Sequence, residues 1–282
     1  MRPLLLCLVP CYLLSAAPSA ARSGARPPER PLPVISDDHK PLPDAVDMER
    51  LAGERPTEFL KECLLRYKRD VKGYRLTMSK EERIAGQLEP REVMEVAFRE
   101  KPFSVFLKWD TGSRRAERAL YVAGENQDRV LARPTKGWYW MAKAAGRLDH
   151  DGLAVEDVDG EAARRSGRFT IKEFGVYNGL ARLLADWEAA QKKDALHVEY
   201  LGVQGVAWAA NRPCWVLRRT RFLKPERDGV TEQTVYIDKE TWLQVGSVAG
   251  GKDGLIGAYY YRDVEINPEF APDQFRPAGL KK

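Results

Sequence analysis

The histidines and cysteines of this 282-residue sequence are the residues best suited to bind a metal or to take part in catalysis. The three histidines, His39, His150 and His197, lie far apart, and no two of them have the spacing of metal ligands. No pair of cysteines lies close enough to complete a site, and no phosphate loop, dinucleotide fingerprint or nucleophile motif is present. We therefore expect no metal site, no cofactor and no catalytic residue.

Two neighbouring carboxylates, Glu81 and Glu82, are the other candidates for acid–base chemistry. They lie in a segment whose hydrophobic residues alternate as in a strand, and successive strand side chains point to opposite faces. The two groups then cannot converge on one bond, so we interpret them as solvated charges near a strand end. An enzyme acting on envelope glycan or lipid would need such groups gathered from distant strands, and we predict that the protein is not an enzyme.

The first residues predict export. Arg2 is followed by an apolar run over residues 3–16, which is about the length of the hydrophobic part of a signal peptide, and then by small residues. We predict a signal peptide at residues 1–21, a cut before Arg22, and localisation in the periplasm or cell envelope. An uncleaved anchor is the alternative, although the run is shorter than a bilayer-spanning helix.

Two cysteines, Cys63 and Cys214, remain after residues 1–21 are removed. Cysteines in an oxidising compartment can form a disulfide, and closing so long a loop would stabilise the fold by roughly 2–5 kcal/mol. Two buried free thiols are the alternative, and the sequence leaves both open.

Residues 22–56 have the composition of a tether, with seven prolines and no aromatic residue. A short helix around Asp44 to Leu51 is compatible with the pattern. The folded domain is then predicted to occupy residues 57–282.

Apolar residues repeating at three and four positions predict two amphipathic helices, one from Thr57 to about Gly73 and one from Asn178 to about Lys193. Elsewhere a period of two predicts short strands joined by polar turns, which is typical of an antiparallel meander. We interpret residues 147–169 as a long surface connection. The strands are predicted at 74–84, 93–99, 103–109, 118–124, 129–134, 197–203, 214–222, 231–237, 242–248 and 255–266.

A sheet with so many strands must curl or close, and its apolar face needs cover. The predicted fold is therefore α+β and mainly antiparallel β: a curled, incomplete barrel whose concave face is covered by the two amphipathic helices. The apolar face of residues 103–109 packs against either this cover or a ligand. We predict the wall of a hydrophobic cavity at Phe103, Val105, Leu107, Trp109, Leu180, Leu184 and Trp187.

The formal charge of +5 is modest and spread along the chain, so we predict no nucleic-acid partner. Residues 212–227 combine five arginines and Lys224 with aromatic residues. Outside the cytoplasm such a segment could meet anionic lipid headgroups or acidic glycan. Because charged and apolar residues alternate there, we interpret it as the charged face of a strand.

Several blocks of sequence resemble, in order, an uncharacterised family of exported bacterial proteins known as a domain of unknown function, over roughly residues 57–276. A more distant resemblance is to the LolA-like superfamily of periplasmic lipoprotein carriers. It implies a curled antiparallel sheet that wraps helices and holds lipid-like groups on its concave side. The blocks are ERIAGQLEPREVMEVAFREKPFSVFLKW, ALYVAGENQDRVLARP, TIKEFGVYNGLARLL, NRPCWVLRRTRF, YIDKETWLQVGS and YYYRDVEINPEFAPDQF.

These observations lead to two hypotheses. In the first, an exported binding protein without enzymatic activity holds a lipid or an acylated protein between its sheet and helices. In the second, an envelope interaction or sensor module with a solid core binds a partner protein or an envelope polymer. The volume enclosed by the sheet distinguishes the two, because a solid core leaves no space for an acyl chain.

Overall fold

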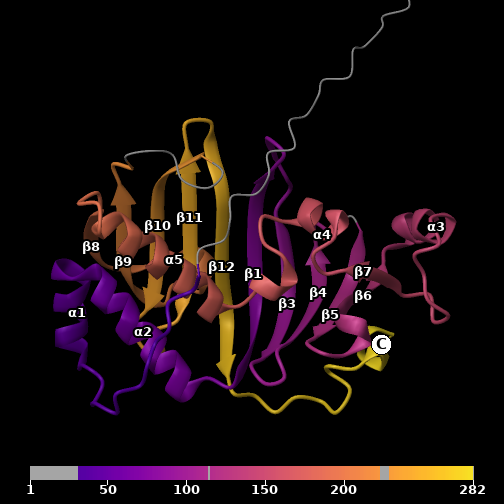
Figure 1. Cartoon of the computed structure of the whole chain (residues 1–282), viewed down its shortest axis with the longest axis horizontal. Helices are drawn as coiled ribbons and strands as arrows, with labels where there is room; N and C mark the ends of the chain where they lie inside the picture. Colours follow the sequence, from indigo (N-terminus) through magenta and orange to yellow (C-terminus); the bar gives the residue numbers. More distant parts are fainter. Residues whose placement is uncertain (1–30, 114, 223–228, 282) are drawn as a thin grey trace, which may run out of the picture.

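The computed structural model describes residues 31–113, 115–222 and 229–281, and shows one long antiparallel sheet with most of its helices on one face and one helix beyond an edge (Figure 1). The predicted signal peptide, residues 1–21, lies outside the described residues and stays a prediction. The helices are α1 (Ala45–Glu54), α2 (Pro56–Asp70), α3 (Lys136–Ala144), α4 (Glu161–Ser166) and α5 (Val176–Gln191). The strands are β1 (Gly73–Ile84), β2 (Gln87–Leu88), β3 (Glu92–Arg99), β4 (Ser104–Thr111), β5 (Ala116–Val122), β6 (Arg129–Pro134), β7 (Ala154–Asp157), β8 (His197–Gly205), β9 (Pro213–Thr220), β10 (Val230–Asp238), β11 (Gln244–Gly251) and β12 (Gly254–Ile266).

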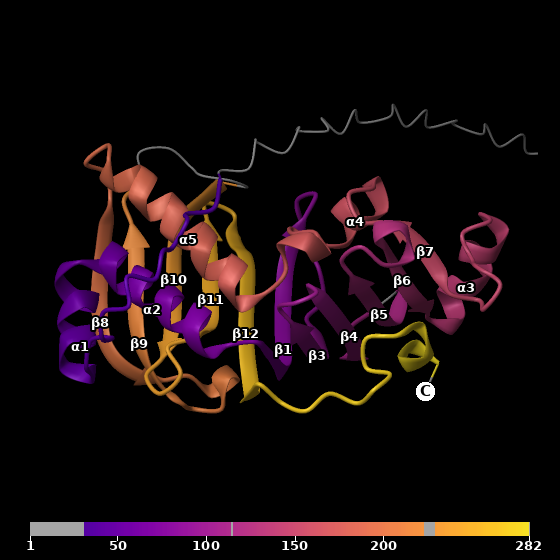
Figure 2. The same cartoon turned by 60° about the horizontal axis from the view of Figure 1, so that its bottom comes forward.

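The 12-stranded sheet consists of two meanders joined through the long strands β1 and β12. One meander runs outward from β1 to β7 and the other from β12 to β8, and the neighbouring strands are antiparallel. The short strand β2 pairs only with β1. Since β7 and β8 form the two edges, the sheet stays open, and Figure 2 shows its β8–β10 side bending around α1 and α2. The predicted α+β class and incomplete barrel are confirmed.

Alternation along each strand separates the two faces of the sheet. Val105 and Leu107 of β4 are buried with the residues of the concave face, whereas Phe106 between them is buried on the convex face. There, the C-terminal residues Phe275 and Leu280 pack against β3–β6. The C-terminal segment therefore covers the convex side of the same half of the sheet.

Three helices fill the concave face on the β8–β11 side (Figure 2). Leu64 of α2 and Leu184 and Trp187 of α5 are buried against Trp215 of β9 and Val235 of β10. Each of these five side chains is fully removed from solvent. This half of the sheet therefore has a solid hydrophobic core.

The structure differs from the predicted tether at residues 22–56. Met48 and Leu51 of α1 are buried in the core, so the folded domain begins well before residue 57, while residues 22–30 lie outside the described part. Two of the prolines that favoured a tether flank the helices. Pro43 precedes the N-cap of α1 and Pro56 is the first residue of α2, positions where a missing N–H costs little.

The ten strands predicted from the sequence all appear within a few residues of their predicted ends. The prediction of residues 147–169 as a surface connection is wrong, because they contain β7 and α4. The helix α3 was also missed. These elements have only 4, 6 and 9 residues, too few for the hydrophobic period to show clearly.

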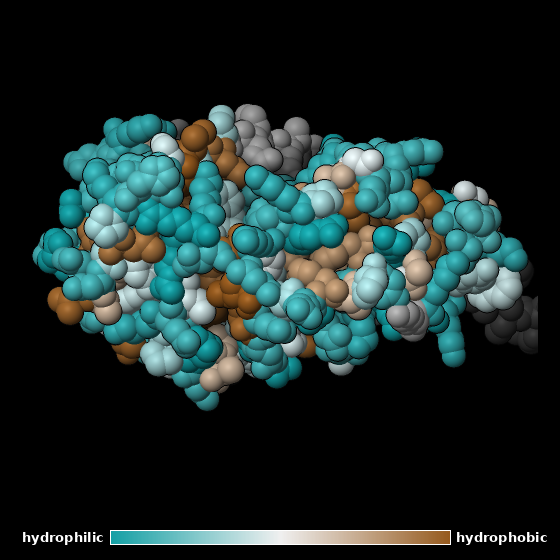
Figure 3. Space-filling model, turned by 90° about the horizontal axis from the view of Figure 1, so that it is seen from below, coloured by the Kyte–Doolittle hydropathy of each residue, from teal (hydrophilic) through white to brown (hydrophobic). Residues whose placement is uncertain are grey.

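Within the described ranges, no helix is long and apolar enough to cross a membrane. The face seen from below in Figure 3 is mainly hydrophilic, with hydrophobic residues showing as separate patches. Most apolar side chains therefore lie between the layers.

Candidate functional site

A cavity of about 520 Å³ lies between the concave face of the sheet and the segment that leads into α5. Its floor is formed by residues of β1 and β3–β7, and it extends under α5 to residues of β10, β11 and β12. Its roof is formed by residues from Gly167 to Val176 together with the start of α5. The concave face is thus solid under α1, α2 and the Leu184 side of α5, and hollow from the Leu183 side of α5 to β7.

Rows of directly paired residues build the floor of the cavity. Met78 of β1 faces Met94 of β3, which faces Trp109 of β4. In the next row Leu107 of β4 is paired with Ala119 of β5. Paired residues on neighbouring strands share one face of a sheet, so each row forms a continuous apolar strip.

Small side chains explain why the cavity is hollow. Ala119, Ala132 and Ala154 are paired in succession on β5, β6 and β7, and all three line the cavity. The same row continues in the other direction through Leu107 to Val96 of β3 and Leu76 of β1, whose side chains are larger and buried. The floor therefore becomes deeper toward the β5–β7 edge.

The roof is fastened to the sheet at the start of α5. Gly175 has φ +116°, a conformation that side chains rarely adopt, and a Cβ there would lie 3.2 Å from the ring of Phe98. This close approach lets the backbone N–H of Val176 donate to the Tyr74 hydroxyl at 3.1 Å. Glycine at this position thus allows the roof to lie directly on the sheet.

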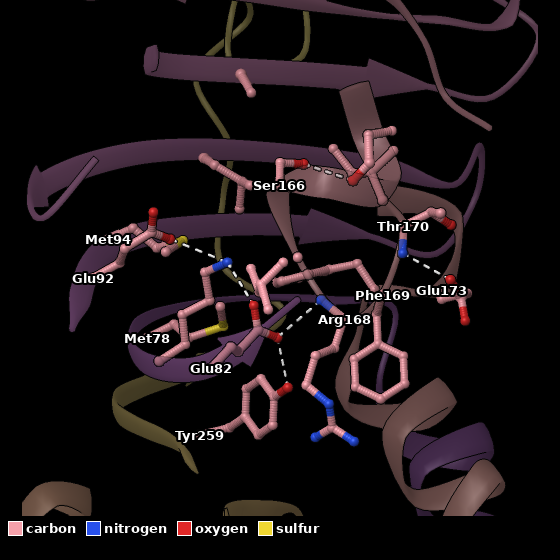
Figure 4. Close-up of a pocket in the computed structure, with 18 of the residues that line it drawn as sticks. Met78, Glu82, Glu92, Met94, Ser166, Arg168, Phe169, Thr170, Glu173 and Tyr259 are labelled. Carbon is pink, nitrogen blue, oxygen red and sulfur yellow. Dashed lines mark hydrogen bonds and ion pairs between the residues drawn. The ribbon is translucent and has the colours of Figure 1, made fainter. Parts of the chain in front are cut away.

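One end of the cavity is charged. Lys80 Nζ lies 3.2 Å from Glu82 Oε2 and 3.1 Å from Glu92 Oε2. The Tyr259 hydroxyl donates to Glu82 Oε1 at 2.6 Å, and the backbone N–H of Arg168 donates to the same oxygen at 3.4 Å. Figure 4 shows the Arg168 guanidinium turned away from Glu82 and toward the side of Phe169. Glu82 therefore joins β1, β12 and the roof.

Charge and burial act in opposite directions on Lys80. Burial alone would lower the pKa of its ammonium group, but Glu82 and Glu92 outweigh burial and raise this pKa above its usual value. Lys80 is therefore a cation at neutral pH. Burial also raises the pKa of the Tyr259 hydroxyl, which stays protonated and can donate to Glu82.

The interpretation of Glu82 as a solvated strand-end charge is wrong, because its residue is only 5% exposed. Glu81 does point to the other face, where it accepts hydrogen bonds from Arg91. The sequence pattern could have predicted that Glu82 points toward the inner face of the sheet. Lys80 and Glu82 continue, in steps of two, the inward positions of Tyr74 and Met78.

The structure places only two of the seven predicted cavity-wall residues at the cavity. Leu107 and Trp109 line the cavity. Val105 is buried in the core beneath it, and Phe103 packs against the rings of Phe98 and Tyr121. Leu180, Leu184 and Trp187 belong to the solid core on the other side, because they face away from the hollow half. Leu183, which was not selected, is the α5 leucine that lines the cavity.

Cys63 and Cys214 are both buried and free in the structure, so the alternative of two unpaired thiols holds there. They belong to different hydrophobic clusters. Cys63 of α2 is packed in the solid core described above, whereas Cys214 of β9 is packed in the cluster that includes Val105 and Leu107 of β4. Burial raises the pKa of Cys63 well above its usual value and that of Cys214 to about 12, so neither is a thiolate at neutral pH.

Metal-binding side chains do not gather in the part of the chain that the structure describes. His39, His150 and His197 are exposed and lie on separate segments. In the basic segment 212–227, Arg218 pairs with Glu199 and Arg212 with Asp238, which fits a charged strand face; residues 223–228 lie outside the described residues.

A family model described as a protein of unknown function, DUF1571, matches residues 71–280. The chain belongs to this family. The resemblance noted from the sequence blocks is thereby confirmed. No curated protein matches the DUF1571 chain.

Solved structures similar to this DUF1571 protein include the complex of MucA and MucB from Pseudomonas aeruginosa, at 14% identity over 80% of this chain and 62% of that chain, with a TM-score of 0.43. The lipoprotein LppX of Mycobacterium tuberculosis has 10% identity over 77% of this chain and 99% of that one, with a TM-score of 0.40. A LolA superfamily protein of Nitrosomonas europaea has 7% identity over 78% and 99%, with a TM-score of 0.33. The DUF1571 chain spans less than two thirds of the MucA/MucB chain that it matches.

Proposed function

We propose that this protein is an exported binding protein that holds the apolar chain of a lipid, or of an acylated protein, in the cavity between the sheet and the roof. The observation that carries this proposal is the cavity itself, about 520 Å³ in volume, with a floor that is apolar over Met78, Met94 and Leu107 and charged at one end. Small-molecule sites commonly enclose about 300–1,000 Å³. A solid-core interaction module, the alternative, would leave no such space.

The composition of the floor suits a ligand of variable shape. Met78 and Met94 lie side by side there. Methionine side chains are flexible and polarisable, so they adapt to different apolar partners. The neighbouring alanines, Ala119 and Ala132, leave the space into which a chain could extend.

The ends of the cavity differ, and this difference suits an amphipathic ligand. Lys80, Glu82 and Glu92 lie at one end, whereas Ala119 and Ala132 line the other side, where Arg147 and Glu156 pair with each other at 3.6 Å. An apolar chain on the alanines would lie away from the cluster of Lys80, Glu82 and Glu92, and a polar head could lie beside that cluster. A fully apolar molecule would leave the charged end without a matching group.

The indole N–H of Trp109 supports the same orientation. It is buried and has no hydrogen-bond partner among the described residues, and Trp109 lines the cavity. Buried donors are nearly always paired in folded proteins. The carbonyl oxygen of an ester or amide that links an acyl chain to its head would be a suitable acceptor.

The test is a titration with cis-parinaric acid, a fatty acid whose fluorescence rises in apolar surroundings. Ala132→Phe fills the cavity, and we expect it to weaken binding at least about tenfold because the side chain occupies the ligand's space. Ala207→Phe is the matched control, since Ala207 is exposed and does not line the cavity. Circular dichroism verifies that both variants are folded. A wild-type chain that does not bind the probe, or an Ala132→Phe variant that binds it equally well, would contradict the proposal.

A further inference from the structure

The helix α3 exposes more apolar surface than the fold requires. Only Ala142 among its residues is buried. Trp140 is 68% exposed and Met141 is 58% exposed. Single exposed apolar residues are ordinary, but here two large ones lie next to each other on one short helix. Figures 1 and 2 show α3 at the end of the molecule, beyond the β7 edge of the sheet.

Basic residues surround these apolar side chains. Lys136 and Lys143 lie four positions before and three positions after Trp140, so all three share one side of the helix. The Lys143 ammonium lies 5.3 Å from the centre of a Trp140 ring. Among the described residues, neither lysine has an acidic partner at ion-pair distance. The stretch 129–147 contains five basic residues and no Asp or Glu.

This surface adjoins the cavity. Trp138 on the inner side of α3 lines the cavity, together with Arg147 just after the helix. The Arg115 guanidinium lies 5.1 Å from the centre of a Trp138 ring. The exposed side of α3 and the cavity wall are therefore two sides of the same short helix.

We propose that α3 docks the protein on an anionic membrane surface, with Trp140 and Met141 entering the interface and Lys136 and Lys143 facing lipid phosphates. Tryptophan favours the boundary between headgroups and acyl chains, and basic residues are attracted to anionic lipids. The mixture of exposed apolar and unpaired basic groups fits this partner better than a neutral protein surface. Docking here brings the α3 end of the cavity against the bilayer.

The experiment places an environment-sensitive fluorophore on the helix in the full-length chain. Met141→Cys is labelled in a background with Cys7→Ser and Cys11→Ser, while Cys63 and Cys214 are buried and do not react readily. Vesicles of phosphatidylglycerol and phosphatidylcholine are expected to shift the emission to the blue, and vesicles of phosphatidylcholine alone are expected to leave it unchanged.

The matched control carries the label at Trp208→Cys. Trp208 is 51% exposed, but it stacks on Tyr260, which points to the opposite face of the sheet from the cavity residues Tyr259 and Tyr261. We expect no shift there. Lys136→Gln and Lys143→Gln should each weaken vesicle affinity about fivefold. Ala132→Phe should leave docking intact, which separates this proposal from ligand binding. An unchanged emission at position 141, or an equal shift at position 208, would overturn it.

Discussion

At the scale of single residues, Glu81 and Glu82 show how one step along a strand changes the role of a carboxylate. Glu81 faces the convex side and pairs with Arg91. Glu82 faces the cavity and pairs with Lys80. It also accepts hydrogen bonds from the Tyr259 hydroxyl and from a backbone N–H of the roof. A buried carboxylate with several partners leaves those partners unpaired when it is removed, whereas an outer ion pair contributes little.

We therefore expect Glu82→Ala to lower the free energy of unfolding by about 3–5 kcal/mol, because it leaves the Lys80 ammonium buried beside fewer charges. Glu81→Ala, the matched control, should cost less than about 1 kcal/mol. Urea unfolding followed by tryptophan fluorescence measures both values. Equal losses for the two variants would show that Glu82 does not fasten the roof to the sheet.

The sequence could have predicted part of this site. Alternation from Tyr74 places Lys80 and Glu82 on the inner face, and it correctly places Leu107 and Trp109 there. Alternation alone cannot show whether an inward side chain meets a helix or empty space. Val105 is buried in a core two residues from Leu107, which lines the cavity, because only the tertiary arrangement positions the roof.

At the scale of elements, the segment before α1 is held on α2. Asp37 is paired with the Arg69 guanidinium, and Lys68 Nζ donates to the Ile35 carbonyl at 2.7 Å. Leu32 packs against the core beneath α1 and α2. Composition could not reveal this, because prolines at helix starts and prolines in a tether look alike in the sequence.

This contact should depend on pH. The hydrogen bonds from Arg69 lower the pKa of Asp37 from 3.8 to about 2. A lowered carboxyl pKa means that the contact stabilises the segment above pH 4 and is lost as the pH falls through about 2. We expect pepsin to cleave residues 31–44 of the wild-type chain faster at pH 2 than at pH 4, when each rate is divided by the rate for a free peptide of the same sequence at the same pH, which removes the pH dependence of pepsin itself.

In the same digestion at pH 4, the relative cleavage rate of Asp37→Asn should be about that of the wild-type chain at pH 2. Asp38→Asn is the matched control, because Asp38 pairs only with nearby Lys40 in the described structure and should behave as the wild type does. Cleavage that is equally slow in both variants would mean that Asp37 does not hold the segment.

At the scale of the whole molecule, one continuous sheet supports two different interiors. Under α2 and α5 large residues such as Trp187 and Trp215 fill the concave face. Beyond β1 the paired alanines of β5, β6 and β7 leave it hollow. The strand pattern predicted the sheet, but hollow and filled halves have the same alternation. The cavity depends on the pairing register that aligns the alanines of β5, β6 and β7, and on the position of the roof.

Native mass spectrometry of the full-length chain, produced in bacteria and purified without detergent, tests the central claim most directly. The account predicts a bound molecule of lipid-like mass that solvent extraction removes and that added phospholipid or fatty acid replaces, with Ala132→Phe remaining empty. A wild-type chain that is empty after purification and remains empty when lipids are added would contradict it.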